Sequence, residues 1–270
     1  MLKLNFTKMN GAGNDFVMID NRSATLTLSR EQIAHICDRH RGVGADGLLL
    51  VEPPQKDGDF RFRYYNSDGG EAEMCGNGAR CFARFAEPFK PGAKTLRFET
   101  VAGLIQAEYD GPLVRLNLSN PKGLELGRKI RLAQGECEIH NCNTGVPHAV
   151  LIVPDADRAY VGQLGAEIRY HADYAPRGTN VNFVQKLGAD RIRVRTYERG
   201  VEGETLACGT GVTAAAIVAH KVLGVTTPVQ VLVQGGDVLE VDFRFEGGNP
   251  VDVFLKGPAD FTFTGTIDVP

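Results

Sequence analysis

The sequence lacks the features of nucleic-acid-binding and membrane-spanning proteins. Its 270 residues include 30 basic and 33 acidic side chains, so the formal net charge is −3, whereas nucleic-acid-binding domains usually carry a basic surplus. Apolar runs such as Ala214–Ala219 fall far short of the roughly 20 residues that a spanning helix needs. Met1–Lys8 lacks the apolar stretch of a signal peptide. We therefore expect a cytoplasmic protein that binds neither nucleic acid nor membrane.

The sequence also lacks the cysteine pattern of a disulfide scaffold and the motifs of common cofactor sites. Six cysteines in a chain of this length, without an export signal, are typical of reduced thiols. Cys137, His140 and Cys142 do not have the spacing of a standard zinc-ligand pair, and no second pair follows. No phosphate, flavin or pyridoxal motif is evident. We therefore predict no metal and no cofactor, and we place Cys37 and Cys81 in the core.

What the sequence does contain is one nine-residue motif that occurs twice. Gly70–Gly78 and Gly203–Gly211 both read G-E-x-x-x-C-G-x-G, and each is followed by a helix-forming run. Cys75 and Cys208 are therefore expected at helix N-termini, where unpaired N–H groups and the helix dipole favour a thiolate. The same N–H groups can bind an anion. Each copy thus predicts a reactive sulfur beside a carboxylate or phosphate site.

The two motifs belong to a longer internal repeat. The cysteines lie 133 positions apart, and the same shift aligns Phe6–Asp20 with Ile139–Val153. It also aligns Leu96–Ala107 with Val229–Glu240, and each of these segments reads as strand, glycine turn and strand. Several blocks in one order at nearly one shift indicate a gene duplication.

The repeat predicts an α/β (α+β) protein of two pseudo-symmetric domains, each a mostly antiparallel sheet wrapped around a central helix. Phe60–Tyr65 and Arg191–Tyr197 alternate as strands do. Val212–Val218 carries no charge, and a helix that is apolar all round is buried. Phe261–Ile267 reads as a last strand that returns to the first domain's sheet. The predicted domain bounds are 1–118 plus 260–270 for the first domain and 119–259 for the second.

Two domains related by a pseudo-two-fold axis would bring Cys75 and Cys208 to opposite sides of one cleft. Two thiols across a small anion site suit the inversion of a carbon acid, because one sulfur removes a proton from one face and the other delivers a proton to the opposite face. The substrate's α-carboxylate would then lie on the two helix N-termini, where it stabilises the developing negative charge. The backbone N–H groups expected to hold it belong to Gly76, Asn77, Gly209 and Thr210.

Several separate stretches resemble one known family, the diaminopimelate epimerases. They are Asn10–Phe16, Arg41–Gly47, Met74–Cys81, Gly145–His148, Tyr197–Gly200 and Ala207–Gly211. The resemblance runs over most of the chain. It implies a cofactor-independent, two-cysteine epimerase that interconverts LL- and meso-diaminopimelate for lysine and peptidoglycan synthesis. It also implies a homodimer.

The resemblance assigns roles residue by residue. Cys75 and Cys208 match the base and acid pair, and His148 and Glu198 match polar partners near the thiols and the reacting amino group. His148 also falls at the counterpart of Asp15 in the internal repeat. The resemblance implies a further set of substrate-binding residues, with the arginine and the asparagines on the distal carboxylate: Asn14, Asn66, Asn180, Glu198 and Arg199.

Two positions depart from the family pattern. Many relatives have asparagine where this chain has Val146, and some have glutamine where it has Gly47. One substrate hydrogen bond is therefore missing at Val146 or supplied elsewhere, with Asn143 and Thr144 as candidates.

Two other functions compete with this interpretation. A racemase of proline or hydroxyproline could use the same fold and the same two thiols. Its substrate has no second carboxylate, so Arg199 and the asparagines would be surplus. A non-catalytic amino-acid-binding protein could use the same cleft, but it would not need both Cys75 and Cys208.

Overall fold

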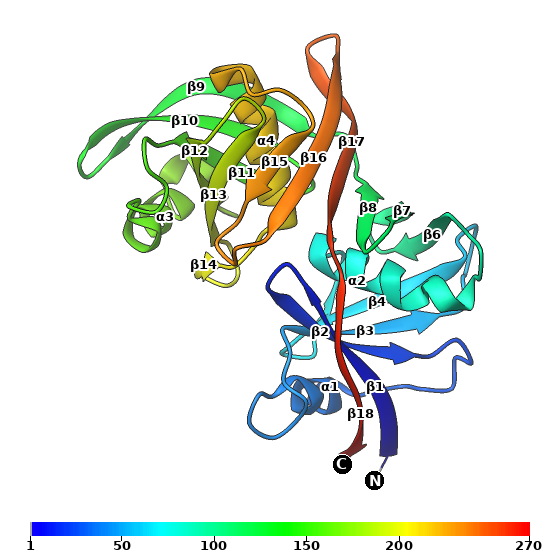
Figure 1. Ribbon diagram of the computed structural model, residues 1–270. Helices are drawn as coiled ribbons and strands as arrows, with labels where there is room; N and C mark the ends of the chain where they lie inside the picture. The colour runs from blue at the N-terminus through cyan, green and yellow to red at the C-terminus, as the bar shows by residue number, and fades with distance from the viewer. Residues whose placement is uncertain (1) are drawn as a thin grey trace. The chain divides into compact units, whose positions relative to one another are not determined.

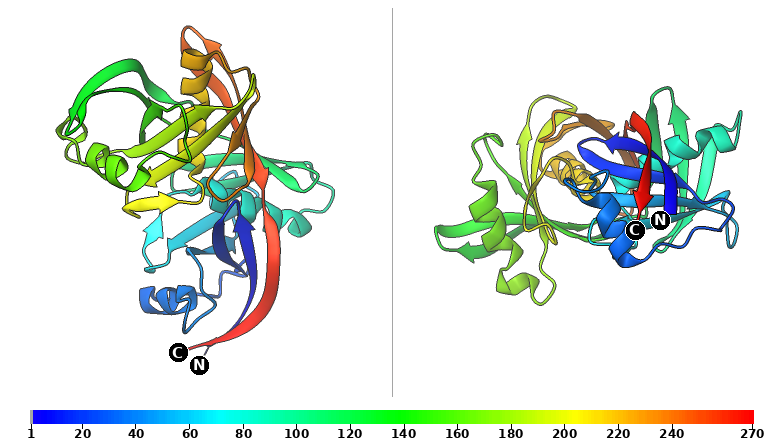
Figure 2. Two further views of the ribbon diagram at one scale, coloured as in Figure 1. Left: turned by 60° about the vertical axis from the view of Figure 1, so that its left-hand side comes forward. Right: turned by 90° about the horizontal axis from the view of Figure 1, so that it is seen from below.

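The protein is described by a computed structural model that covers residues 2–270 (Figures 1 and 2). The chain forms two compact units. The first contains the residues up to Asn117 together with Gly257–Pro270, and the second contains Leu118–Lys256. No helix in residues 2–270 is long and apolar enough to cross a membrane.

The first unit is a sheet with a helix on each face. In sheet order, the pairs run from β18 through β1, β2, β3, β4, β6 and β7 to β8. Only β2 with β3 and β4 with β6 are parallel. The elements are β1 (Leu2–Gly11), β2 (Asn14–Asp20), α1 (Arg30–Cys37), β3 (Gly47–Glu52), β4 (Phe60–Asn66), β5 (Glu71–Ala72), α2 (Gly76–Ala86), the 3-10 helix Glu87–Phe89, β6 (Thr95–Thr100), β7 (Gly103–Asp110), β8 (Leu113–Asn117) and β18 (Asp260–Val269).

The second unit repeats this arrangement. Its pairs run from β9 through β10, β11, β12, β13, β15 and β16 to β17, and again only the third and fifth pairs, β11 with β12 and β13 with β15, are parallel. The elements are β9 (Lys122–Leu132), β10 (Gly135–Asn143), β11 (Pro147–Ile152), α3 (Val161–Arg169), the 3-10 helix Ala172–Tyr174, β12 (Asn180–Lys186), β13 (Arg191–Glu198), β14 (Gly203–Thr205), α4 (Gly209–Leu223), β15 (Val229–Leu232), β16 (Val238–Glu246) and β17 (Asn249–Pro258).

The predicted fold class and internal duplication are confirmed by this match. In the matching parallel pairs, Phe16 faces Gly47 in the first unit and Ala149 faces Val181 in the second. The last strand returns to the first unit's sheet, where β18 pairs antiparallel with β1. In Figures 1 and 2 the strands of each unit curve around a central helix, α2 in one and α4 in the other.

The central strands are apolar on both faces because both faces are covered. In β2 and β3, Val17 and Leu48 belong to a core cluster with α1. The opposite face of the same strands packs on α2, where Gly78 lies against Leu49 and Phe16. This double cover explains the unbroken apolar runs of these strands, which are typical of strands buried on both sides. In α4 every residue from Val212 to Ala219 is buried, which confirms the prediction of a buried central helix.

Candidate active site

Cys75 lies at the N-terminus of α2 in the first unit. It is the N-cap residue, with extended backbone angles (φ −139°, ψ 121°), and its side chain is half-buried. The backbone N–H of Gly78 donates to the Cys75 Sγ atom across 3.5 Å. A sulfur in this position replaces the oxygen of an ordinary capping residue, so the helix N-terminus stabilises negative charge on it.

Cys208 lies at the N-terminus of α4 in the second unit. It is again the N-cap residue (φ −122°, ψ 106°), and it is 7% exposed. Its Sγ atom is 3.5 Å from the hydroxyl of Thr210. The motif therefore predicted correctly that both cysteines start helices, but the two sulfurs have different neighbours.

Three of the other cysteines are poor candidates for acid–base chemistry. Cys37 and Cys81 are buried, as the sequence predicted, and so is Cys142. Burial raises the pKa of each of these three thiols to about 12. A thiol that stays protonated near neutral pH cannot act as a base.

In the first unit, Asn14 is held by two side-chain hydrogen bonds. Its Nδ2 atom donates to Asp46 across 2.6 Å, and its Oδ1 atom accepts from Asn77 across 2.9 Å. Asn14 reaches this position because the β1–β2 turn, Ala12–Gly13, has positive φ at both residues. The turn thus fixes Asn14 beside the first turn of α2.

Arg80, a neighbour of Asn77 in the first unit, is a residue that sequence reasoning missed. It is fully buried, and its guanidinium donates to the carbonyl oxygens of Gly11, Gly76 and Pro258 and to the side chain of Asn77. One sequence signal was available, because Arg80 lies two residues after the cysteine motif with small and apolar residues on either side. Its role is to join the N-terminus of α2 to the β1–β2 turn.

An ion network supports the same end of the sheet. Asp15 accepts from Lys8 across 2.8 Å and from both terminal nitrogens of Arg39, and Arg39 also contacts Asp46 across 2.8 Å. Burial alone would raise the pKa of Asp15, but the hydrogen bonds from Arg39 and Lys8 outweigh it and hold this pKa well below 3.8. The network places Asp46 against Asn14, a contact that the sequence did not predict.

In the second unit, His148 is 1% exposed and lies behind Thr210. Its Nε2 atom is 3.0 Å from the Thr210 hydroxyl, and its Nδ1 atom is 3.1 Å from Nδ2 of Asn182. Burial, with a smaller effect from the positive charge of Arg199, lowers the pKa of His148 to about 3. The imidazole is therefore neutral near pH 7.

Asn180, Glu198 and Arg199 lie at one end of the same sheet. Asn180 is opposite His148 in the β11–β12 pair. Its Oδ1 atom accepts the backbone N–H of Arg199 across 2.9 Å, and Glu198 accepts from the hydroxyl of Thr205 across 2.9 Å. Asn180, the neighbour of His148 in the sheet, thus also contacts the backbone of Arg199.

Three further positions of interest are Asn66 and the two that depart from the family pattern, Gly47 and Val146. Asn66 is exposed at the end of β4, opposite Gly47. Val146 is half-buried. Asn143 and Thr144 are the candidates to replace the substrate hydrogen bond that is missing at Val146. Both already make hydrogen bonds inside the second unit: Asn143 accepts from the backbone of Gly145, and Thr144 donates to the carbonyl of Thr210.

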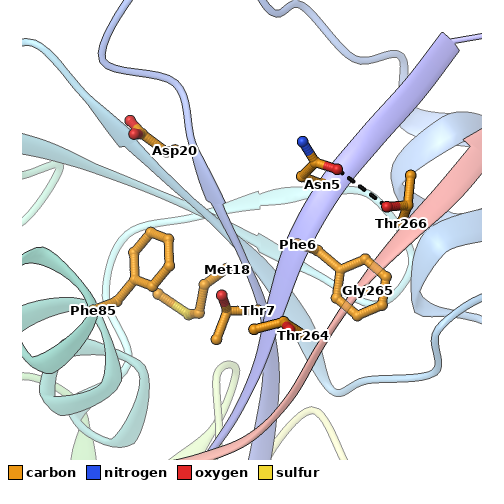
Figure 3. A pocket seen from close by; sticks show the side chains of 9 residues that line it. All are labelled: Asn5, Phe6, Thr7, Met18, Asp20, Phe85, Thr264, Gly265 and Thr266. Atoms are coloured by element: carbon orange, nitrogen blue, oxygen red, sulfur yellow. Dashed lines mark hydrogen bonds between the residues drawn. The ribbon is translucent and has the colours of Figure 1, made fainter.

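The pocket in Figure 3 lies elsewhere on the first unit. Its volume is about 410 Å³, and it is formed by β1, β2, β18 and Phe85. At its edge the Thr266 hydroxyl donates to Asn5 across 3.1 Å, and a dashed line marks this hydrogen bond in Figure 3. None of the predicted site residues lines this pocket. Each unit instead carries its candidate cysteine at the N-terminus of its own central helix, α2 or α4.

Comparisons with known proteins agree with the two-unit architecture. The sequence model of the diaminopimelate epimerase family matches residues 6–119 and 140–262. The chain is 46% identical over 277 residues to the diaminopimelate epimerase of Aquifex aeolicus (strain VF5), with 98% of each chain covered.

Solved structures of lower identity share the fold. A phenazine biosynthesis protein of the PhzF family from Bacillus anthracis superposes with a TM-score of 0.76 at 14% identity, with both chains fully covered. A probable proline racemase from Agrobacterium radiobacter K84 superposes with a TM-score of 0.71 at 18% identity, covering 99% of this chain and 93% of that one.

Proposed function

The chain belongs to the diaminopimelate epimerase family, and we propose that Cys75 and Cys208 are the acid–base pair of its reaction. The protein is an isomerase that converts LL-diaminopimelate to meso-diaminopimelate, a step that serves lysine and peptidoglycan synthesis. The proposal for the two cysteines is supported by one observation above all: each caps a topologically equivalent central helix.

Inversion at one carbon needs a group on each face. In the proposed mechanism, one sulfur acts as a thiolate and removes the α-proton, while the other acts as a thiol and protonates the opposite face. The helix dipoles favour the thiolate form, because each sulfur lies at the positive end of a helix. The units are proposed to act together on one substrate carbon, one cysteine from each.

The substrate's α-carboxylate is proposed to bind the N–H groups in the first turns of α2 and α4. Donors fixed in advance at a site of developing charge stabilise the carbanion without reorganisation. Glycine in these turns allows the carboxylate to approach the backbone closely. The donors proposed for it belong to Gly76, Asn77, Gly209 and Thr210.

The remaining predicted residues are proposed to bind the rest of diaminopimelate. Arg199 offers a planar fork that suits a carboxylate, and Asn14, Asn66 and Asn180 would complete the distal site. Glu198 is proposed to contact the reacting amino group. His148 is proposed to support the chemistry as a neutral hydrogen-bonding group, since its low pKa argues against a role as a general base.

Solvent-isotope labelling tests the two-base mechanism. LL-diaminopimelate in deuterated water should give product that carries deuterium at the inverted carbon from the first turnovers, because the product's proton comes from a solvent-exchanged thiol. Remaining LL-substrate should stay largely protonated at first. Early product that keeps the original proton would indicate a single base. Proline under the same conditions should show no exchange.

Single cysteine variants test the assignment. Cys75→Ala and Cys208→Ala should each slow epimerisation by at least about 10²-fold, the lower end for a lost general acid or base. Cys137→Ala is the matched control, because Cys137 is half-buried on β10 and belongs to no proposed contact with substrate. A near-normal rate in either of the first two variants would contradict the assignment.

We also propose that the protein forms a homodimer and is located in the cytoplasm. Phe261 and Phe263 on β18 are 56% and 49% exposed, and exposed apolar patches often mark protein interfaces. The need for two reduced thiols fits a reducing compartment. Sedimentation of the wild-type protein and of a Phe263→Ser variant tests the dimer; a wild-type monomer at micromolar concentration would contradict it.

A further inference from the structure

Behind Cys208, a row of buried polar side chains crosses the second unit's sheet beneath the first turn of α4. His148, Asn182 and Thr196 come from the adjacent strands β11, β12 and β13, and they are 1%, 0% and 3% exposed. The row ends at Thr210, whose hydroxyl is near Cys208. Buried polar groups need defined partners, so each hydrogen bond in such a row has one direction.

The direction is fixed at Asn182. Its Nδ2 atom donates to the backbone carbonyl oxygen of Ala149 across 3.2 Å, and its Oδ1 atom accepts from the Thr196 hydroxyl across 3.0 Å. A carbonyl oxygen can only accept, so this hydrogen bond favours the amide nitrogen on the side of Ala149 and His148. The Thr196 hydroxyl, which donates to the amide oxygen, holds the same orientation from the other side.

This orientation decides the tautomer of His148. The amide nitrogen of Asn182 is a donor, so the Nδ1 atom of His148, 3.1 Å away, must accept. In a neutral imidazole the proton is then on Nε2. Burial, together with the positive charge of Arg199, keeps the ring neutral by lowering the pKa of His148 to about 3.

Thr210 lies between His148 and the sulfur of Cys208. The Nε2–H group donates to the Thr210 hydroxyl oxygen, 3.0 Å away. With that oxygen accepting from His148, the hydroxyl proton of Thr210 is directed away from the ring. Cys208 Sγ is 3.5 Å from Thr210 Oγ1, and a thiolate at that position can only accept.

We infer that Thr196 and Asn182 are positioning residues for Cys208, holding His148 as its Nε2–H tautomer so that Thr210 donates a hydrogen bond to the sulfur. This inference rests on the proposed role of Cys208. It gives His148 a defined function as a neutral donor. A hydrogen bond to a charged acceptor is stronger than one to a neutral group, so this row stabilises the thiolate form of Cys208.

Gly211 makes room for the row. A Cβ atom at this position would lie 2.4 Å from Oδ1 of Asn182 and 3.3 Å from Cε1 of His148. The last glycine of the second motif therefore permits the close approach of α4 to the side chains beneath it.

The Cys75 sulfur of the first unit has different hydrogen-bond partners from the Cys208 sulfur, so Cys75 serves as an internal control. The residue equivalent to Thr210 is Asn77, whose Nδ2 atom donates to Asn14. Cys75 Sγ accepts from the backbone N–H of Gly78 instead. Substitutions in the His148 row should therefore change the reactivity of Cys208 and leave that of Cys75 unaltered.

The direct test is the imidazole nitrogen spectrum of His148 in the whole protein, labelled with ¹⁵N and assigned by loss of the signals in His148→Gln. We expect a neutral ring with its proton on Nε2 from about pH 5.5 to about pH 8.5, since its pKa lies far below this range. A proton on Nδ1, or titration within the range, would overturn the inference. This readout does not depend on catalysis, so it can fail while the proposed function stands.

Two substitutions test the positioning roles. Asn182→Asp replaces the amide donor by an acceptor and should add a proton at Nδ1 of His148. Thr196→Val removes the hydroxyl at nearly constant volume and should produce a mixture of tautomers, whereas Thr196→Ser should keep the wild-type spectrum. An unchanged His148 spectrum in both Asn182→Asp and Thr196→Val would overturn the roles of these residues.

The effect on the sulfur is measured by alkylation with iodoacetamide at low conversion, with peptide mass spectrometry to resolve each cysteine. In Thr210→Val and in Thr196→Val, the pH of half-maximal alkylation of Cys208 should rise by about one unit, the effect of losing a hydrogen bond to a charged group. The same midpoint for Cys75 should stay unchanged. A Cys208 midpoint equal to that of the wild type in both variants would overturn the inference.

Discussion

The guanidinium of Arg80 donates to the side-chain oxygen of Asn77 across 3.0 Å in the interior of the first unit. Arg80 is fully buried, and it also donates to the carbonyl oxygens of Gly11 and Gly76. Cys75 precedes Gly76 directly, so one side chain fixes the backbone on which this cysteine and its proposed carboxylate donors depend.

Arg80→Met should therefore destabilise the protein and impair epimerisation. The variant leaves several buried acceptors without their donor, and we expect a loss of roughly 3 kcal/mol in the free energy of unfolding. Urea unfolding measures it. Arg97→Met is the control, because Arg97 is exposed on β6. Equal stability of the two variants would argue against the role given to Arg80.

The ion pairs of Asp15 predict a pH-dependent contribution to stability. Asp15→Asn removes the partner of the buried Lys8, which should cost about 3 kcal/mol near pH 7. The folded-state pKa of Asp15 is held below 3.8, so its contribution is complete above the unfolded-state pKa and is lost as the pH falls through the folded-state pKa.

The difference in unfolding free energy between wild type and Asp15→Asn should accordingly be constant between about pH 6 and about pH 8 and should shrink below about pH 4. Urea titrations at these pH values measure it. A difference that grew on acidification would mean that the pKa of Asp15 is raised by folding.

Arg199→Ala tests the proposed distal carboxylate site. Loss of one partner of a buried charged hydrogen bond should raise the KM for diaminopimelate by at least roughly thirtyfold, while circular dichroism shows a folded protein. Arg191→Ala is the control, since Arg191 is exposed at the start of β13. Similar kinetics for the two variants would place Arg199 outside the substrate site.

Gly211→Ala should cost stability and activity together. The added methyl group would meet Asn182 at 2.4 Å, and overpacking of this kind costs roughly 2 kcal/mol. Gly162→Ala is the matched helical control, because a Cβ at Gly162 meets nothing within 4 Å. Thermal unfolding and initial rates measure both effects, and a Gly211→Ala variant as stable and active as the control would contradict the close contact.

Much of the fold could be predicted from the sequence because many of its elements depend on local sequence patterns. The two cysteine motifs, the uncharged run that became α4 and the alternating run that became β13 each depend on residues that are near one another in the chain. Asn182 and Thr196 could not be found in this way. They read as ordinary strand residues, and only strand pairing brings them into one row with His148.

By itself, the sequence determined that two cysteines would begin two equivalent helices, because in each motif the cysteine and its glycine-rich turn are followed directly by a helix-forming run. Only the tertiary structure decided how each sulfur is stabilised. The Cys75 sulfur accepts a hydrogen bond from a backbone N–H group. The Cys208 sulfur instead contacts the hydroxyl of Thr210, the last side chain of the buried polar row. The physical reason is that helix starts follow from local propensity, while the direction of a buried hydrogen bond follows from partners contributed by distant strands.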